Sequence, residues 1–482
     1  MLRDRVTAFE IPHILEAICE RLNAEDICHC RAVCKVWLEI FNPHHWRSVR
    51  LVDIDGHSTV PFLSPTERAL IRQNAQWIRS MVIRTQETLF LDTPCTRLRT
   101  LDCRWSNGFS AQLPDPASPT ALDVILWNPG LRLLRIDCHG DMSWSPNKTL
   151  LTFLQSPFCG LTSLRLHLYD LTEGFYPVVL VSILQALPHS LRELHIADKR
   201  GYSRASCNLD KLGPQHSLIS ELASQWRPNA VRWFRLMCPF PLRFEYAFLI
   251  PFLQSSPLLE DLKLPTVPAA QAQALMTVVG KSCPNLKALH LNLGVMVGSH
   301  GGTEAGHFGC LRQSLKSLNV DIGMDIGNCV PLTVLSYSTR TITELKLKEA
   351  YYMTSDHIVA ILRTCISLQV LPVRGVTHHG GIATRAKIRQ LVDLKPWACT
   401  RLKSLVLPIA CEKAEKDEEL AKLVLELFKR IRELEYMRQE AGGVLVLTWY
   451  GKVSTLDLKM ALSVLNYEMS EKELDWMGLY WS

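Results

Sequence analysis

The chain of 482 residues lacks a long uninterrupted apolar run. Its most apolar stretch, residues 176–187, contains Pro177 and is followed by Pro188. That stretch is well short of the roughly 20 residues that span a bilayer. The first 22 residues place charges among the apolar positions, unlike a secretory signal. These absences predict a soluble, intracellular protein, cytoplasmic or nuclear, that binds no membrane.

Sequence motifs of common enzymes are also missing. The chain contains no Gly-x-Ser-x-Gly elbow, no His-Glu-x-x-His and no dinucleotide fingerprint after an expected strand. The glycine-rich segment 298–309 has Gly-x-x-x-Gly spacing but no Gly-Lys-Ser/Thr, which argues against a phosphate loop. We therefore expect a non-catalytic protein without a cofactor, and not a nucleotide-switched repeat receptor.

Regular cysteine spacing is absent as well, although the chain has 16 cysteines. Scattered cysteines among apolar positions are typical of buried, reduced thiols. Cys28, Cys30 and Cys34 follow a C-x-C-x-x-x-C spacing on an expected helix. Cys30 and Cys34 lie one turn apart on its apolar face, so we interpret these two as buried small hydrophobic residues and expect no metal. The pairs at 44–45 and 378–379 are interpreted as loop or surface histidines. A net charge of +6 permits an acidic partner and does not by itself predict nucleic acid.

An internal repeat is the main feature that is present. The hexad apolar-x-x-apolar-x-apolar recurs along the chain, and in its most regular stretches, residues 131–191 and 259–342, the copies begin 27 to 30 residues apart. Its alternation predicts a short strand with one buried face. Clear copies begin at residues 161, 191, 259, 286, 315, 342 and 402, and weaker ones at 98, 131, 231, 368, 431 and 474.

The segments between the hexads often have a helical pattern, as in residues 178–187 and 357–364. Several end before Pro188, Pro257 or Pro284, which would stop a helix. Units of this kind cannot bury their apolar faces alone, so they stack into a solenoid with a parallel inner sheet and outer helices. From about Leu98 to the C-terminus the chain resembles the leucine-rich-repeat family. The asparagine expected after each hexad is mostly missing, and the longer spacings predict inserted loops.

The first fifty residues do not follow the repeat. Residues 7–10 have capping-box spacing, and Pro12 suits a first helical turn. Asn23 to Asp26 has the pattern of a second helix start. A third helix contains Val36 and is expected to end at Pro43. So small a unit can hardly bury all its apolar residues, which predicts a partner surface.

The N-terminal string resembles an F-box in the order of its elements. It has the apolar-proline pair Ile11-Pro12, then Leu22 and Asp26-Ile27, and then residues 33–37 as Val-Cys-Lys-x-Trp. The resemblance implies docking to the Skp-type adaptor of a cullin-based ubiquitin ligase, with a protein substrate held by the repeats. It also implies an adaptor-binding set, whose members either contact the adaptor or hold the helices together: Ile11, Pro12, Ile14, Leu15, Ile18, Ile27, Val33, Cys34 and Trp37.

The fifth hexad position is expected to point out of the inner sheet face, because it lies between two buried positions. Strands about 4.8 Å apart would stack these side chains into a mostly basic column, which Asp137 and Asp261 partly offset. The column is either an ordinary solvated face or a site for an acidic or phosphorylated segment of the substrate. Its members are Arg135, Arg165, His195, Arg235, Lys263, His290, Asn319 and Lys346.

The sequence therefore predicts an α/β protein in three parts. Residues 1–50 form the three-helix adaptor-docking module, residues 51–97 a linker, and residues 98–482 an irregular leucine-rich-repeat solenoid. The leading hypothesis is the substrate-receptor subunit of an SCF-type ubiquitin ligase. The alternative is a repeat scaffold without a role in ubiquitin transfer.

Overall fold

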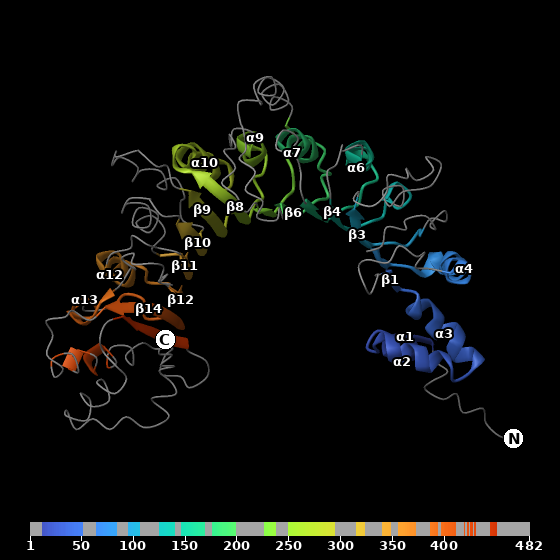
Figure 1. The fold of residues 1–482 in the computed structure, drawn as a ribbon, viewed down its shortest axis with the longest axis horizontal. Coiled ribbons are helices and arrows are strands. Elements are labelled where there is room, and N and C mark those ends of the chain that lie inside the picture. The colour runs from blue at the N-terminus through green and yellow to red at the C-terminus, as the bar shows by residue number, and fades with distance from the viewer. Residues whose placement is uncertain are drawn as a thin grey trace. The chain divides into compact units, whose positions relative to one another are not determined.

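The computed structural model describes residues 12–51, 64–83, 95–106, 125–139, 146–168, 176–198, 226–237, 249–294, 315–322, 340–348, 355–372, 386–393, 397–410 and 444–450, with scattered positions between 419 and 429. The chain is divided into two compact units, Met1–Leu222 and Ala223–Ser482. Each is a parallel sheet with helices in its connections, and the first also carries three N-terminal helices (Figure 1).

The first unit begins with α1 (Pro12–Cys19), α2 (Ala24–Arg31) and α3 (Lys35–His45). Its strands β1 to β6 pair in sequence order, and every pairing is parallel. These are β1 (Ser48–Leu51), β2 (Ser80–Ile83), β3 (Thr100–Ser106), β4 (Leu133–His139), β5 (Ser163–Leu168) and β6 (Glu193–Asp198). The connections contain α4 (Pro65–Asn74), a 3₁₀ turn (Ala75–Trp77), α6 (Pro146–Gln155) and α7 (Tyr176–Gln185).

The second unit continues the same plan. Strands β7 to β12 pair in sequence order, and β14 then pairs with β12, β13 and β15, all in parallel. The strands are β7 (Trp233–Met237), β8 (Asp261–Pro268), β9 (Ala288–Gly294), β10 (Ser317–Ile322), β11 (Glu344–Lys348), β12 (Val370–Pro372), β13 (Ala386–Lys387), β14 (Ser404–Ala410) and β15 (Val444–Tyr450). The helices are α9 (Leu249–Gln254), α10 (Ala269–Ser282), α12 (Ser355–Thr364) and α13 (Ile388–Asp393).

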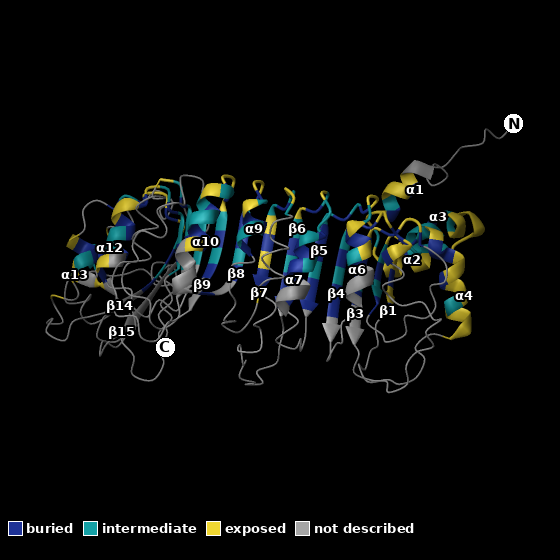
Figure 2. Cartoon of the chain, turned by 90° about the horizontal axis from the view of Figure 1, so that it is seen from above, coloured by how far each residue is buried: buried dark blue, intermediate teal, exposed yellow. Residues whose placement is uncertain are grey.

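The hexad explains both the strands and the core. In the copy that begins at Leu161, positions one, four and six are Leu161, Leu164 and Leu166, and all three are fully buried. In the copies that begin between Leu98 and Leu402, the same positions are buried wherever their burial is described, and they form the buried stripe shown in dark blue in Figure 2. Successive copies stand in register, so that Leu134, Leu164 and Leu194 are direct neighbours on β4, β5 and β6. The predicted repeat and its parallel sheet are confirmed.

The helical connections also agree with the prediction. Helix α7 ends three residues before Pro188, α9 ends before Pro257, and α10 ends before Cys283-Pro284. In Figure 1, α6 and α7 lie on one face of the first sheet, and α9, α10 and α12 lie on one face of the second. No helix among the described residues is long and apolar enough to cross a bilayer. The glycine-rich segment 298–309, the histidines at 378–379 and the hexads at 431 and 474 lie outside the described residues.

Three boundaries differ from the prediction. The sheet starts at β1 rather than near Leu98, because residues 46–51 and 78–83 already carry the hexad, and α4 and β2 occupy the expected linker. The expected limit at residue 50 falls inside β1. Helix α3 continues through Pro43 to His45. A proline in the last turn removes a single bond, and Trp46 N–H still donates to the carbonyl of Asn42 at 3.1 Å.

Candidate functional site

The three N-terminal helices enclose a small apolar core of their own. Leu15 and Phe41 are fully buried, and Cys19 and Ile27 are nearly so. Trp37 stacks on Phe41 with ring centroids 5.4 Å apart. Helix α2 begins as predicted, because the Asn23 side chain accepts a hydrogen bond from the N–H of Asp26 at 2.8 Å. This core fixes which apolar residues remain on the outside.

The predicted adaptor-binding set divides between that core and the surface. Leu15 and Ile27 are core residues, and Ile18 and Trp37 are half-buried against the core. These four hold the helices together. Exposed members are Ile14, Val33 and Cys34, with 62% of Val33 accessible. Pro12 begins α1, while Ile11 lies just outside the described residues.

Two further exposed apolar residues were not predicted. Val36 is 55% accessible and Leu38 is 42% accessible, although Val36 was expected to fill the third helix. Of the twelve large apolar side chains that the described residues expose, four are Ile14, Val33, Val36 and Leu38 of this short module. Such a concentration of exposed apolar residues on so small a unit is typical of a protein-binding surface.

The cysteines of α2 and of the turn that follows it differ in their exposure to solvent. Cys30 packs against the module core as predicted. The prediction for Cys34 was wrong, because its side chain is exposed, as is that of Cys28. The Cys28 thiol lies 3.4 Å from Nδ1 of His45. Within the described part of the chain, no three His, Cys, Asp or Glu side chains come together as a group that could hold a metal ion.

The fifth hexad position forms the predicted row on both sheets. On the first, Asp102, Arg135, Arg165 and His195 are direct neighbours on β3 to β6. On the second, the row contains Arg235, Lys263, His290, Asn319 and Lys346 on β7 to β11. The strand register therefore places these side chains next to one another on adjacent strands, as predicted.

Carboxylates on neighbouring positions compensate the charge of this row. Arg165 Nη2 lies 2.9 Å from Glu193 Oε1, and Arg235 Nη2 lies 2.8 Å from Asp261 Oδ2. Lys346 pairs with Glu344 at 2.6 Å. Since the paired side chains are half-exposed, these contacts are weak individually, but they leave little uncompensated positive charge. The row on its own is a mixed-charge face rather than a basic one.

A buried polar cluster lies on the first sheet beside this row and includes its Arg135. Asp137, which is 4% accessible, contacts His167 Nδ1 at 2.8 Å and Arg135 Nε at 3.2 Å. Burial alone would raise the pKa of Asp137, but the His167 hydrogen bond and the Arg135 charge outweigh it and lower that pKa to about 2. The cluster is satisfied internally, and it therefore stabilises the sheet rather than offering a binding group.

Parallel strands that each carry the hexad, with helices in their connections, define a leucine-rich-repeat protein. Residues 12–52 match the family model described as F-box-like, which covers α1 to β1. The chain thus has an F-box-like domain followed by leucine-rich repeats.

Among solved structures, the chain is similar to the leucine-rich repeat-containing protein LegL7 from Legionella pneumophila. The two share 13% identity with a TM-score of 0.32, and the match covers 69% of this chain and 99% of that chain. No curated relative of the chain was found.

Proposed function

We propose that this protein is the substrate-receptor subunit of an SCF-type, cullin-based ubiquitin ligase. Its F-box-like domain would dock on the Skp-type adaptor, and its repeats would hold a protein substrate. It would carry no catalytic residues, and it would act in the cytoplasm or the nucleus. The observation that carries the proposal is the F-box-like domain with Val33 and Val36 exposed on it.

The exposed residues fit helix-into-groove recognition by apolar anchors. Burying an aliphatic side chain of this size contributes about 1.5 to 3 kcal/mol. A few such anchors account for most of the binding energy in typical interfaces. Because Leu15 and Phe41 already fill the interior of the module, the exposed set is free to engage a partner without unfolding it.

Capture of the adaptor tests the proposal. The purified full-length chain would be mixed with the adaptor–cullin complex, and bound adaptor measured for the wild type, for Val33→Glu/Val36→Glu and for Phe158→Glu. Phe158 is the matched control, because it is 78% accessible but belongs to the repeats. We expect the wild type and the control to bind and the double variant to lose binding with an unchanged melting temperature.

Two results would contradict this. A folded wild-type chain that never captures the adaptor would overturn the ligase role and favour the repeat scaffold. Wild-type binding by the double variant would show that the adaptor uses a different surface. Transfer of ubiquitin to a captured substrate by the reconstituted complex then tests the role as substrate receptor directly.

A further inference from the structure

A second row of cations lies at the start of the strands in the first unit. Arg47, Arg79, Arg99 and Arg132 each occupy the second hexad position, directly before β1, β2, β3 and β4. We name these four residues the arginine column. The carbonyl of each of the first three accepts a hydrogen bond from the N–H of the next, at 2.7 to 3.0 Å. The strand spacing therefore sets four exposed arginines about 4.8 Å apart.

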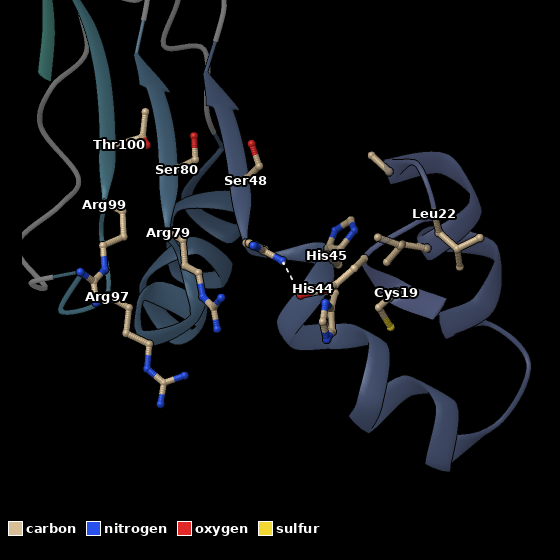
Figure 3. Close-up of a pocket in the computed structure, with 14 residues that line it drawn as sticks. Cys19, Leu22, His44, His45, Ser48, Arg79, Ser80, Arg97, Arg99 and Thr100 are labelled. Carbon is tan, nitrogen blue, oxygen red and sulfur yellow. Dashed lines mark ion pairs between the residues drawn. The ribbon is translucent and has the colours of Figure 1, made fainter. Parts of the chain in front are cut away.

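The column borders a pocket of about 790 Å³ between the F-box-like domain and the first strands of the sheet. Arg79, Arg97 and Arg99 line the sheet side, and His44 and His45 line the helix side (Figure 3). The guanidinium of Arg97 is held over the ring of Trp77, 5.1 Å from its centroid. His44 and His45 were expected in a loop or on the surface, but they stand half-buried in the last turn of α3.

Little negative charge compensates these cations. Among the described residues that line the pocket, Glu20 is the one carboxylate, and it pairs with Arg47 at 3.9 Å across an exposed surface. No described carboxylate lies within 4 Å of Arg79, Arg97, Arg99 or Arg132. Like charges on adjacent strands are unfavourable unless something offsets them. Within the part of the chain that the structure describes, these four arginines therefore have no carboxylate counter-charge and are available to a bound anion.

The second unit shows how the same repeat position is neutralised internally. There Arg232, Glu260 and Lys287 occupy the second hexad position on three successive strands. Glu260 contacts Arg232 at 3.3 Å and Lys287 at 2.6 Å. An acidic residue between two basic ones is thus compatible with this fold, whereas the arginine column contains none.

We propose that the pocket and the arginine column bind an extended acidic peptide segment of the substrate, with carboxylate or phosphate groups on the guanidiniums. This deepens the proposed function, since it names a partner class for the repeats, but the binding itself does not depend on ubiquitin transfer. Arginine suits such groups because its planar fork donates two hydrogen bonds to one anion. Ser48, Ser80 and Thr100 add hydroxyl donors along the same wall.

The shape of the site favours an extended chain over a compact anion, because Arg132 continues the column beyond the residues that line the pocket. It also favours a peptide over a single-stranded nucleic acid. Bases are held by stacking on aromatic side chains, and the described residues that line the pocket include no Phe, Tyr or Trp. His44 and His45 of α3 line the pocket on the side of the F-box-like domain.

Fluorescence anisotropy on the purified full-length chain tests this inference. Three labelled peptides share one scaffold and carry phosphoserine, glutamate or serine at alternate positions, and oligouridylate serves as a fourth probe. We expect the phosphoserine and glutamate peptides to bind and the serine peptide not to bind. The phosphoserine and glutamate arms show whether phosphate or carboxylate is preferred. Affinity should fall steeply with added salt.

Arg79→Glu/Arg99→Glu should lower the affinity for the two anionic peptides by at least tenfold, because each arginine is expected to make charge-assisted hydrogen bonds to them. The control is Lys316→Glu/Lys403→Glu, which changes the same hexad position in the second unit and should leave affinity unchanged. Equal affinity of the arginine variant and the wild type would overturn the proposal, as would tighter binding of oligouridylate than of either anionic peptide. Adaptor capture is measured on the same variants, so a failed peptide site is distinguished from a failed ligase role.

Discussion

The backbone carbonyl of Arg79 accepts hydrogen bonds from the N–H groups of Arg99, at 2.7 Å, and of Thr100, at 3.0 Å. This pairing places two exposed arginines on adjacent positions of a parallel sheet, with no described carboxylate within ion-pair distance of either. The fold itself imposes the proximity, because side chains at one hexad position of successive repeats must stack. The stacked cations therefore oppose folding slightly in the absence of an anion.

The first prediction concerns that repulsion. Arg99→Gln should raise the free energy of unfolding of the ligand-free protein at low salt by roughly 0.5 kcal/mol, the size of a like-charge contact near water. The urea midpoint should rise accordingly. The difference should vanish at 0.5 M salt, where the Debye length is only a few ångströms. Lys316→Gln is the matched control and should change little. A lower midpoint for Arg99→Gln at low salt would mean that an unrecognised group already compensates Arg99.

The second prediction concerns the buried carboxylate of Asp137. Its pKa is lowered from 3.8 to about 2, because the His167 hydrogen bond and the Arg135 charge outweigh the effect of burial. A lowered pKa stabilises the fold above pH 3.8, and this contribution is lost as the pH falls from about 4 to about 2. Asp137→Asn should therefore cost about 2 kcal/mol at neutral pH.

The measurement is the urea midpoint of wild type and Asp137→Asn as a function of pH. The gap between the two should close as the pH falls below about 4. Asp102→Asn is the control, since Asp102 reaches Arg135 only at 3.8 Å and its side chain is more accessible; its loss should be smaller. A gap that stays constant down to pH 2 would show that the carboxylate charge contributes nothing.

The third prediction separates core from surface in the F-box-like domain. Phe41→Ala removes a fully buried ring that stacks on Trp37, and such a cavity typically costs 3 to 5 kcal/mol. Val36→Ala, at a side chain that is 55% accessible, should change stability by less than about 0.5 kcal/mol. Hydrogen exchange of α1 to α3 in the full chain measures both. Equal protection in the two variants would contradict the assignment of Phe41 to the core.

Much of the fold was predictable because each hexad predicts the position of a strand, and equivalent hexad positions predict how neighbouring strands align. Leu161 and Leu191 begin hexads 30 residues apart. The first position of every described hexad from Leu98 to Leu402 is buried. The first strands were missed because the intervals from residue 46 to 78 and from 78 to 98 are unequal and fall outside the regular spacing. The hexads there are nevertheless complete, with Ile78, Met81 and Ile83 buried.

The interaction sites were predictable only in part. Helical periodicity in Pro12–Cys19 marks an apolar stripe, but it cannot say that Leu15 is buried while Ile14 is 38% accessible. That division depends on where α3 packs. The positive charge of the row at the fifth hexad position was overestimated, because Arg165 pairs with a carboxylate on the next strand, that of Glu193. Reading the second hexad position down the chain would have found the arginine column.

The last prediction uses the histidines beside that column. Burial is the main cause that lowers the pKa of His44; Glu16 and Glu20 raise it, and Arg47 and Arg79 lower it further. For His45, burial and then Arg31 lower the pKa, and the Cys28 thiol lies against its ring.

An acidic peptide in the pocket would favour the protonated rings of these two histidines, so the affinity for the peptide should rise as the pH falls from 7.5 to 5.5. The glutamate peptide is the appropriate probe, because its carboxylates stay ionised over most of this range. His44→Gln should flatten the pH profile measured by anisotropy while leaving affinity at pH 7.5 nearly unchanged, and His189→Gln, at an exposed histidine of the repeats, should not. An unchanged profile in His44→Gln would place the bound carboxylates away from α3 and confine the peptide to the arginine side of the pocket.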